Sequence, residues 1–158
     1  MNFLEHYIKA LDCLNSNKVD YMVVGGFAVN VHGFTRSTTD IDIWIDLKKD
    51  NLERLLKAFV ELGYNKDNSI KAIEALSKSH MIKIPLENTK IELVDDFIVK
   101  NDFDKCYKNH FSTKINGRDV RFIGFEDLIV CKENSIRMKD ALDAKNLKEL
   151  RKLRDGLS

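Results

Sequence analysis

The sequence predicts an α+β fold in which a mixed β-sheet is flanked by helices, and three observations support this class. Segments with helical periodicity alternate with short β-branched apolar runs, a pattern typical of helices packed on a sheet. Neighbouring apolar runs are joined by tight turns, so part of the sheet is expected to be antiparallel. The 158 residues contain no linker-like stretch, and we therefore expect one domain spanning residues 1–158.

The first third of the chain predicts a helix, a strand, a short helix and a second strand. Residues 2–14 place apolar side chains at helical spacing, and residues 21–24 form an apolar run of strand length. Two glycines interrupt this run before a short helix over residues 27–32. Residues 39–47 alternate isoleucine with other side chains, which indicates a strand with two different faces.

The middle of the chain predicts two helices and two strands. Residues 51–62 are amphipathic and Gly63 follows them, as glycine often follows the end of a helix. Residues 69–76 show a weaker helical pattern. Residues 81–86 and 90–94 are apolar runs on either side of a polar turn, and we expect both to be strands.

The last third predicts a helix, a hairpin and two closing helices. Residues 101–109 have helical character. Residues 111–115 and 119–123 flank an Asn-Gly dipeptide, which is the strongest short-range hairpin signal in the chain. Two further helices are expected over residues 125–133 and 139–153.

The composition excludes several classes of protein. Hydrophobic residues make up 44% and charged residues 32% of the chain, as in a soluble globular protein. No apolar run approaches the roughly 20 residues that cross a bilayer, so we expect no membrane partner. The 26 basic and 25 acidic residues give a net charge of +1, which provides no global attraction to nucleic acid. Three widely spaced cysteines predict neither a zinc site nor disulfides, and a cytoplasmic location is expected.

Asp40 and Asp42 form the first motif with chemical content. Two residues apart on a strand, they share one face at a backbone separation of roughly 6.5–7 Å. Like charges on one face repel, and a divalent cation such as Mg²⁺, which prefers carboxylate oxygens, removes this repulsion. The alternative is a strand face that is simply exposed to water.

Gly25 and Gly26 form the second motif, between a predicted strand and a predicted helix. Without a Cβ atom they let a phosphate group approach the backbone closely, and the following helix offers unpaired N–H groups. The alternative is a plain tight turn. An anion site and a cation site are thus expected on adjacent elements.

The run "GGFAVNVHGFTRSTTDIDIWI" resembles the signature of the DNA polymerase β-like nucleotidyltransferase superfamily, in which a Gly-Gly helix start precedes a hydrophobic Asp-x-Asp strand. It looks most like the small stand-alone bacterial members, among them relatives of the AbiEii-type toxins. The resemblance implies a nucleotidyltransferase-like mixed sheet. It also implies transfer of a nucleoside monophosphate (NMP) from a nucleoside triphosphate (NTP) to an acceptor.

The resemblance assigns the metal ligands. Asp40 and Asp42 are expected to hold Mg²⁺ or Mn²⁺ together with a third acid, and Glu92 in the stretch "TKIELVDDF" is the candidate. Similar sequences usually carry aspartate at this position, so Glu92 is a departure. Asp95 and Asp96 are rival candidates, and the alternative for Glu92 is an edge-strand residue that faces water.

The same resemblance assigns the nucleotide contacts. Gly25 and Gly26 are expected to hold the terminal phosphates of the NTP, with Arg36 as a further triphosphate contact. Lys132 is the candidate contact from the C-terminal region. The alternative for Arg36 is an exposed loop arginine.

The C-terminal stretch "CKENSIRMKDALDAKNLKEL" also resembles the tail of the small bacterial branch. Asp140 and Asp143 lie three residues apart and share one face of the predicted helix. The alternative, which we favour for most of these charges, is an amphipathic helix whose charged face is in water. The apolar side of that helix would be formed by Leu142, Leu147, Leu150 and Leu153.

The expected function is metal-dependent NMP transfer to a small molecule, a protein side chain or an RNA end. The chain has little room for a separate acceptor domain, so acceptor surfaces are expected from a homodimer or from a partner protein of the toxin–antitoxin type. The alternative is a catalytically weak nucleotide-binding module, or a toxin–antitoxin-type partner module, with the same fold. Fold alone does not decide between these functions.

Overall fold

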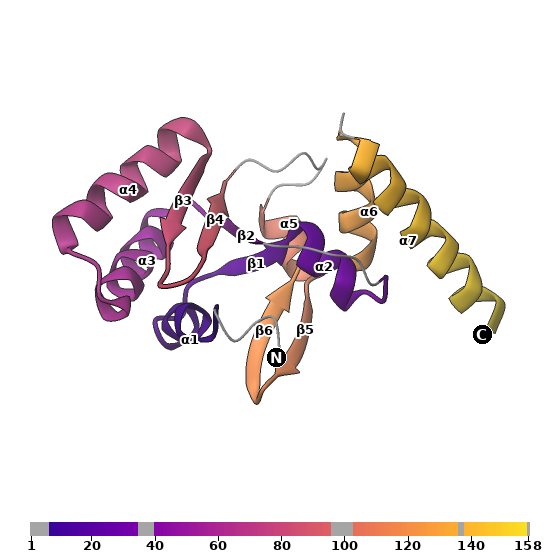
Figure 1. Ribbon diagram of the computed structural model, residues 1–158, viewed down its shortest axis with the longest axis horizontal. Coiled ribbons are helices and arrows are strands. Elements are labelled where there is room, and N and C mark those ends of the chain that lie inside the picture. The colour runs from indigo at the N-terminus through magenta and orange to yellow at the C-terminus, as the bar shows by residue number, and fades with distance from the viewer. Residues whose placement is uncertain (1–6, 35–39, 96–102, 136–137, 158) are drawn as a thin grey trace.

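The computed structural model describes residues 7–34, 40–95, 103–135 and 138–157 of the chain (Figure 1). Six strands form its sheet: β1 Tyr21–Val24, β2 Ile41–Ile45, β3 Met81–Pro85, β4 Lys90–Val94, β5 Phe111–Ile115 and β6 Arg118–Phe122. The helices of these ranges are α1 Ile8–Ser16, α2 Gly25–Val31, α3 Lys49–Leu62, α4 Lys66–Ser79, α5 Phe103–Lys108, α6 Phe125–Glu133 and α7 Met138–Leu157.

The sheet is mixed, with the strand order β3-β4-β2-β1-β6-β5. The hairpins β3–β4 and β5–β6 are antiparallel, as is the central pair β1–β2, whereas β2 pairs with β4 and β1 with β6 in parallel. Figure 1 shows α3 and α4 toward the β3–β4 side of the molecule and α6 and α7 toward the other side. The predicted α+β class with a mixed sheet is confirmed.

The core forms where helices α1 and α3 cover one face of the sheet. The three isoleucines of β2, Ile41, Ile43 and Ile45, are at most 1% exposed, as their alternation in the sequence predicts. Trp44 points to the opposite face, and it is also buried because its ring packs edge-on against Phe103 at 5.3 Å. Both faces of β2 are therefore covered at this level.

The predicted elements are all present, and the differences lie at their ends. Helix α4 is longer than the periodicity indicates because Asn65 caps it, accepting a hydrogen bond from the backbone N–H of Asn68. Helix α3 ends at Gly63, whose φ of 111° is in the left-handed region. Helix α2 begins at Gly25 rather than at residue 27, so the two glycines belong to its first turn.

The prediction for the closing helix is wrong about which face of α7 is buried. Leu142 and Leu153 are 57% and 67% exposed, whereas Asp140 and Asp143 are buried together with Leu147. Helical spacing identifies residues that share a face, but the neighbouring helix decides which face is covered. Here α6 supplies a buried lysine, and the aspartates turn toward it.

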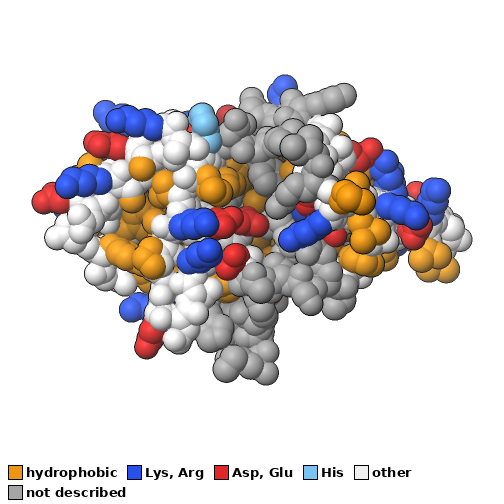
Figure 2. Space-filling view, turned by 45° about the horizontal axis from the view of Figure 1, so that its top comes forward, with side chains coloured by type: hydrophobic (Ala, Val, Ile, Leu, Met, Phe, Trp, Pro, Cys, Tyr) orange, Lys and Arg blue, Asp and Glu red, His pale blue; other side chains and the backbone are white. Residues whose placement is uncertain are grey.

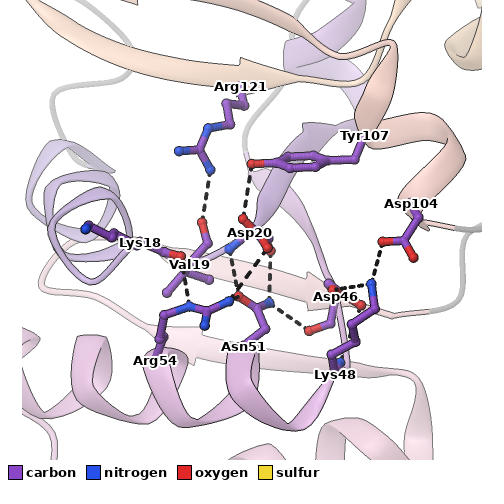
Figure 3. Close-up of polar contacts among 10 residues, drawn as sticks. All are labelled: Lys18, Val19, Asp20, Asp46, Lys48, Asn51, Arg54, Asp104, Tyr107 and Arg121. Atoms are coloured by element: carbon purple, nitrogen blue, oxygen red, sulfur yellow. Dashed lines mark hydrogen bonds and ion pairs between the residues drawn. The ribbon is translucent and has the colours of Figure 1, made fainter.

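A cluster of polar contacts lies where strand β1 begins and strand β2 ends (Figure 3). The buried amide of Asn51 accepts from the Asp20 N–H at 2.7 Å and donates to the carbonyl oxygens of Asp20 and Asp46 at 3.1 and 2.8 Å. Arg121 donates to the Val19 carbonyl oxygen. These contacts fasten the first turn of α3 to the ends of both strands.

Figure 2 shows acidic and basic side chains interspersed among the described residues of one face, which form no extended field of one sign. This distribution agrees with the nearly balanced charge of the sequence. None of the described helices is long and apolar enough to span a bilayer.

Candidate functional site

Gly25 packs directly against the carboxyl group of Asp42. Strand β1 pairs with β2 so that Val24 lies opposite Asp42, and α2 starts at the next residue. Gly25 is buried and has a φ of 70°, a conformation that favours glycine. A Cβ atom at this position would lie 2.3 Å from Asp42 Oδ2, which is too close for any side chain. Glycine is therefore required both by the backbone and by its neighbour.

Asp42 and Glu92 lie side by side on adjacent parallel strands. The register of β2 and β4 pairs Asp42 with Glu92, so both side chains leave the same face of the sheet. Burial raises the pKa of Asp42 to about 7, and the hydrogen bond to Glu92 and the negative charge of Glu92 add to this effect. A pKa in this range leaves the Asp42 carboxyl partly protonated near neutral pH.

Two further charged residues act on this pair. Asp40 immediately precedes β2, is partly exposed, and raises the pKa of Asp42 through its negative charge. Lys83 lies opposite Glu92 on β3, and its Nζ is 4.0 Å from Glu92 Oε1. Sequence reasoning missed Lys83, although the hairpin expected from the two strand-like runs would have paired the lysine with Glu92 once its register was known.

Lys132 approaches the pair from α6. Its side chain is 4% exposed, and its positive charge lowers the pKa of Asp42. Strand β6 leads into α6 beside the end of β1, because the Ile123 N–H donates to the Val23 carbonyl oxygen. Lys132, the nucleotide contact predicted from the C-terminal region, is therefore close enough to Asp42 to lower its pKa.

The residue types fit a divalent cation, although no metal group is preformed. Among the described residues, no three His, Cys, Asp or Glu side chains are arranged to hold a metal ion as they stand. The raised pKa of Asp42 nevertheless shows that its negative charge is poorly compensated, a cation would replace its proton, and oxygen donors suit Mg²⁺. The absence of a Cβ at Gly25 lets the Asp42 carboxyl group pack directly against the backbone at the start of α2.

The structure brings together Gly25, Asp42 and Glu92, with Asp40 and Lys132 acting on Asp42 electrostatically. Gly26 is buried in the first turn of α2. The predicted phosphate contact Arg36 and the rival acid Asp96 lie outside the described residues. The other rival, Asp95, is at the far end of β4, where its carboxylate pairs with His80 at 2.9 Å.

A cavity of about 430 Å³ lies apart from these acids. It opens beside α1, the end of α3 and the turn between β3 and β4, and no predicted site residue lines it. Its lining residues are Lys9, Ala10, Leu62, Gly63, Tyr64, Pro85, Leu86, Glu87 and Asn88. We place the candidate site at the Asp42–Glu92 pair, because the predicted metal ligands and the raised pKa of Asp42 are found there and not in the cavity.

A family model described as nucleotidyl transferase of unknown function (DUF2204) matches residues 3–156. The chain belongs to this nucleotidyl transferase family. The resemblance to nucleotidyltransferases that the glycine and aspartate motifs indicate is thereby confirmed. Membership makes the chain a nucleotidyltransferase and implies a nucleotide substrate.

Solved structures of two nucleotidyltransferases share the fold of this family member. The crystal structure of the lincosamide antibiotic adenylyltransferase LnuA with bound lincomycin is 18% identical, with a TM-score of 0.50 over 91% of this chain and 95% of that one. A proposed nucleotidyltransferase from Thermotoga maritima is 15% identical, with a TM-score of 0.52 over 98% and 92% of the respective chains. No curated protein matches the sequence significantly.

Proposed function

We propose that this nucleotidyltransferase moves an NMP from an NTP to an acceptor hydroxyl with the help of a divalent cation held by Asp42 and Glu92, and by Asp40. The observation that carries the proposal is the in-register Asp42–Glu92 pair, in which burial and mutual repulsion raise the pKa of Asp42 to about 7. Such a pair is unfavourable in a resting protein and useful where a cation must be held.

In the proposed reaction the acceptor oxygen bonds to the α-phosphorus, the bond from that phosphorus to the bridging oxygen breaks, and pyrophosphate leaves. When bound, the divalent cation supplies charge neutralisation for the phosphoryl oxygens. Asp42 and Glu92, in register on adjacent strands, would hold that cation, and Glu92 is proposed to accept the proton of the acceptor hydroxyl. Gly25 and Gly26, in the first turn of α2, would face the phosphates with backbone groups, and Lys132 would add a positive charge.

The first test is transfer of label from an NTP labelled at the α-phosphate, with Mg²⁺ or Mn²⁺. We expect Asp42→Asn and Glu92→Gln each to lower turnover by about a hundredfold or more. Asp46→Asn is the matched control, because Asp46 follows the other end of β2 and should leave turnover within about twofold of the wild type. Equal turnover of wild type and Asp42→Asn would contradict the assignment.

The acceptor is proposed from the fold. LnuA is by its name an adenylyltransferase for lincosamide antibiotics, so ATP and small hydroxylated molecules are the first substrates to screen. Protein side chains and RNA ends follow, with the label located by electrophoresis. A homodimer or a partner protein of the toxin–antitoxin type would be detected in the same screen as a change in mass by light scattering.

The second candidate function is nucleotide binding with weak turnover, either alone or as a toxin–antitoxin-type partner module. It is favoured by the raised pKa of Asp42, because a protonated carboxyl group is a poor cation ligand. Calorimetric binding of an NTP without release of pyrophosphate at pH 6 and at pH 8 would support this module. Pyrophosphate release that increases with pH supports the enzyme instead.

A further inference from the structure

Helices α6 and α7 enclose a cluster of three buried charges. The Lys132 Nζ lies 2.7 Å from Asp140 Oδ1 and 3.2 Å from Asp143 Oδ2, and each of the three side chains is at most 4% exposed. Ser135 Oγ donates to the second oxygen of Asp140 at 2.6 Å. One lysine is thus held between two carboxylates, and one of these is itself fixed by a hydroxyl group.

The packing of the two helices does not explain this cluster. Ala144 and Leu147 bury apolar surface, and exposed ion pairs, among them Lys148 with Glu133 at 2.7 Å, already join α6 to α7. Apolar residues of similar volume often stabilise a buried position as well as an ion pair does or better.

The cluster lies close enough to the Asp42–Glu92 pair for one of its members to act there. Lys132 is the member whose charge reaches Asp42, the acid at the centre of the proposed site. An ammonium group has three N–H donors, and two carboxylates leave one of them for another acceptor. A phosphate oxygen is a suitable acceptor, since charge-assisted hydrogen bonds to phosphate are among the strong ones.

We propose that Asp140 and Asp143 are positioning residues, which hold the Lys132 ammonium group in the orientation that meets the phosphate groups of an NTP. The inference rests on the proposed function and adds two residues of α7 to it. The aspartates act through Lys132 and do not contact the nucleotide. Their removal should therefore weaken NTP binding more than it slows the chemical step.

The test is a double-mutant cycle in the full chain, made of Asp143→Asn, Lys132→Gln and the two together. We expect Asp143→Asn to raise the KM for ATP about tenfold and to change kcat less than about threefold. In the Lys132→Gln background the same change should have no further effect on KM, because a positioning residue has nothing left to position. Additive effects would overturn the inference.

Two further variants separate positioning from folding. Lys148→Gln breaks an exposed ion pair between the same helices, and its KM should equal that of the wild type. Ser135→Ala removes the hydroxyl from Asp140 while keeping every charge, and it should raise KM about twofold to threefold. This milder variant decides the question if Asp143→Asn does not fold: a KM equal to that of Lys148→Gln would overturn the inference.

Calorimetric titration of ATP gives a readout that does not depend on turnover. Loss of affinity in Asp143→Asn, with a thermal midpoint no lower than that of Lys148→Gln, supports positioning. Wild-type protein that turns over ATP while Asp143→Asn binds as tightly as wild type overturns the positioning role alone. Wild-type protein that neither binds nor turns over any NTP overturns the proposed function as well.

Discussion

Polar groups are buried at both ends of strands β1 and β2, but different residues accompany them at the two ends. At one end the backbone groups of Asp20 and Asp46 are joined by the neutral amide of Asn51, which makes hydrogen bonds with both (Figure 3). At the other end Asp42 and Glu92 crowd together, and burial raises the pKa of Asp42 to about 7. The first arrangement is satisfied within the protein, and the second is satisfied only by a proton or a cation.

This difference indicates which end of the strands contributes to stability and which contributes to function. A buried amide with complete hydrogen bonding contributes stability and has no capacity left for a ligand. Adjacent buried carboxylates cost stability, and they persist where a function requires them. The comparison predicts that changes at the Asn51 end alter folding, whereas changes at the Asp42 end alter nucleotide chemistry and its dependence on pH.

The largest expected effect is the pH dependence of stability caused by Asp42. Its pKa is raised from 3.8 to about 7, so between these values the folded state holds a proton that the unfolded state releases. Metal-free stability from this group therefore falls as pH rises from 4 to 8, by up to about 4 kcal/mol. Chemical denaturation of wild type and Asp42→Asn across this range measures it, since the variant lacks the titrating group.

Mg²⁺ extends the same experiment. A cation that replaces the proton of Asp42 should stabilise the wild type more at pH 8 than at pH 6, and it should leave Asp42→Asn unchanged. If the unfolding free energies of the wild type and Asp42→Asn depend on pH in the same way, with and without Mg²⁺, Asp42 is not the group that takes up the proton or the cation.

The next effect belongs to the Asn51 end. Asn51→Ala leaves one backbone N–H and two carbonyl oxygens without their partner, and we expect it to cost about 3 kcal/mol of unfolding free energy. Turnover below the melting temperature should stay within about twofold of the wild type. Asn65→Ala, which removes a single exposed helix cap, is the control and should cost about 1 kcal/mol. A large loss of turnover in Asn51→Ala would contradict the separation.

Gly25→Ala has the third largest expected loss of unfolding free energy, and it tests the contact between Gly25 and Asp42 directly. The new Cβ meets Asp42 Oδ2 at a backbone φ of 70°, and we expect a loss of about 2 kcal/mol together with a strong loss of turnover. Gly63→Ala is the control, since Gly63 also has a positive φ but has no neighbour within 4 Å of an added Cβ. It should cost about 1 kcal/mol and keep its activity. Equal activities of the two variants would show that Asp42 tolerates displacement.

Lys83→Gln has the smallest expected effect. The side chain is exposed and its Nζ is 4.0 Å from Glu92 Oε1, so the ion pair contributes about 0.5 kcal/mol or less. Denaturation and steady-state kinetics should both lie close to the wild-type values. A KM for NTP raised tenfold would instead make Lys83 a nucleotide contact and extend the site to β3.

The sequence predicts that the glycine turn and the Asp42 strand are neighbours, as Gly25 and Asp42 are, better than it predicts the surroundings of Lys132. Alternation along a strand fixes which side chains share a face, and glycine next to a strand end marks a close approach. The burial of Lys132, Asp140 and Asp143 depends on how α6 and α7 dock, and helical spacing does not contain that information. The contact of Lys83 with Glu92 depends likewise on a strand register that residue types alone do not fix.

Trp44 is the one tryptophan of the sequence, and it lies two residues beyond Asp42 on the same face of β2. Its indole N–H donates to the Asp95 carbonyl oxygen, and its ring packs edge-on against Phe103. The protein thus carries an intrinsic fluorophore, shielded from solvent, next to its acidic pair. Its emission can follow the arrival of an ion or nucleotide in real time without any attached dye.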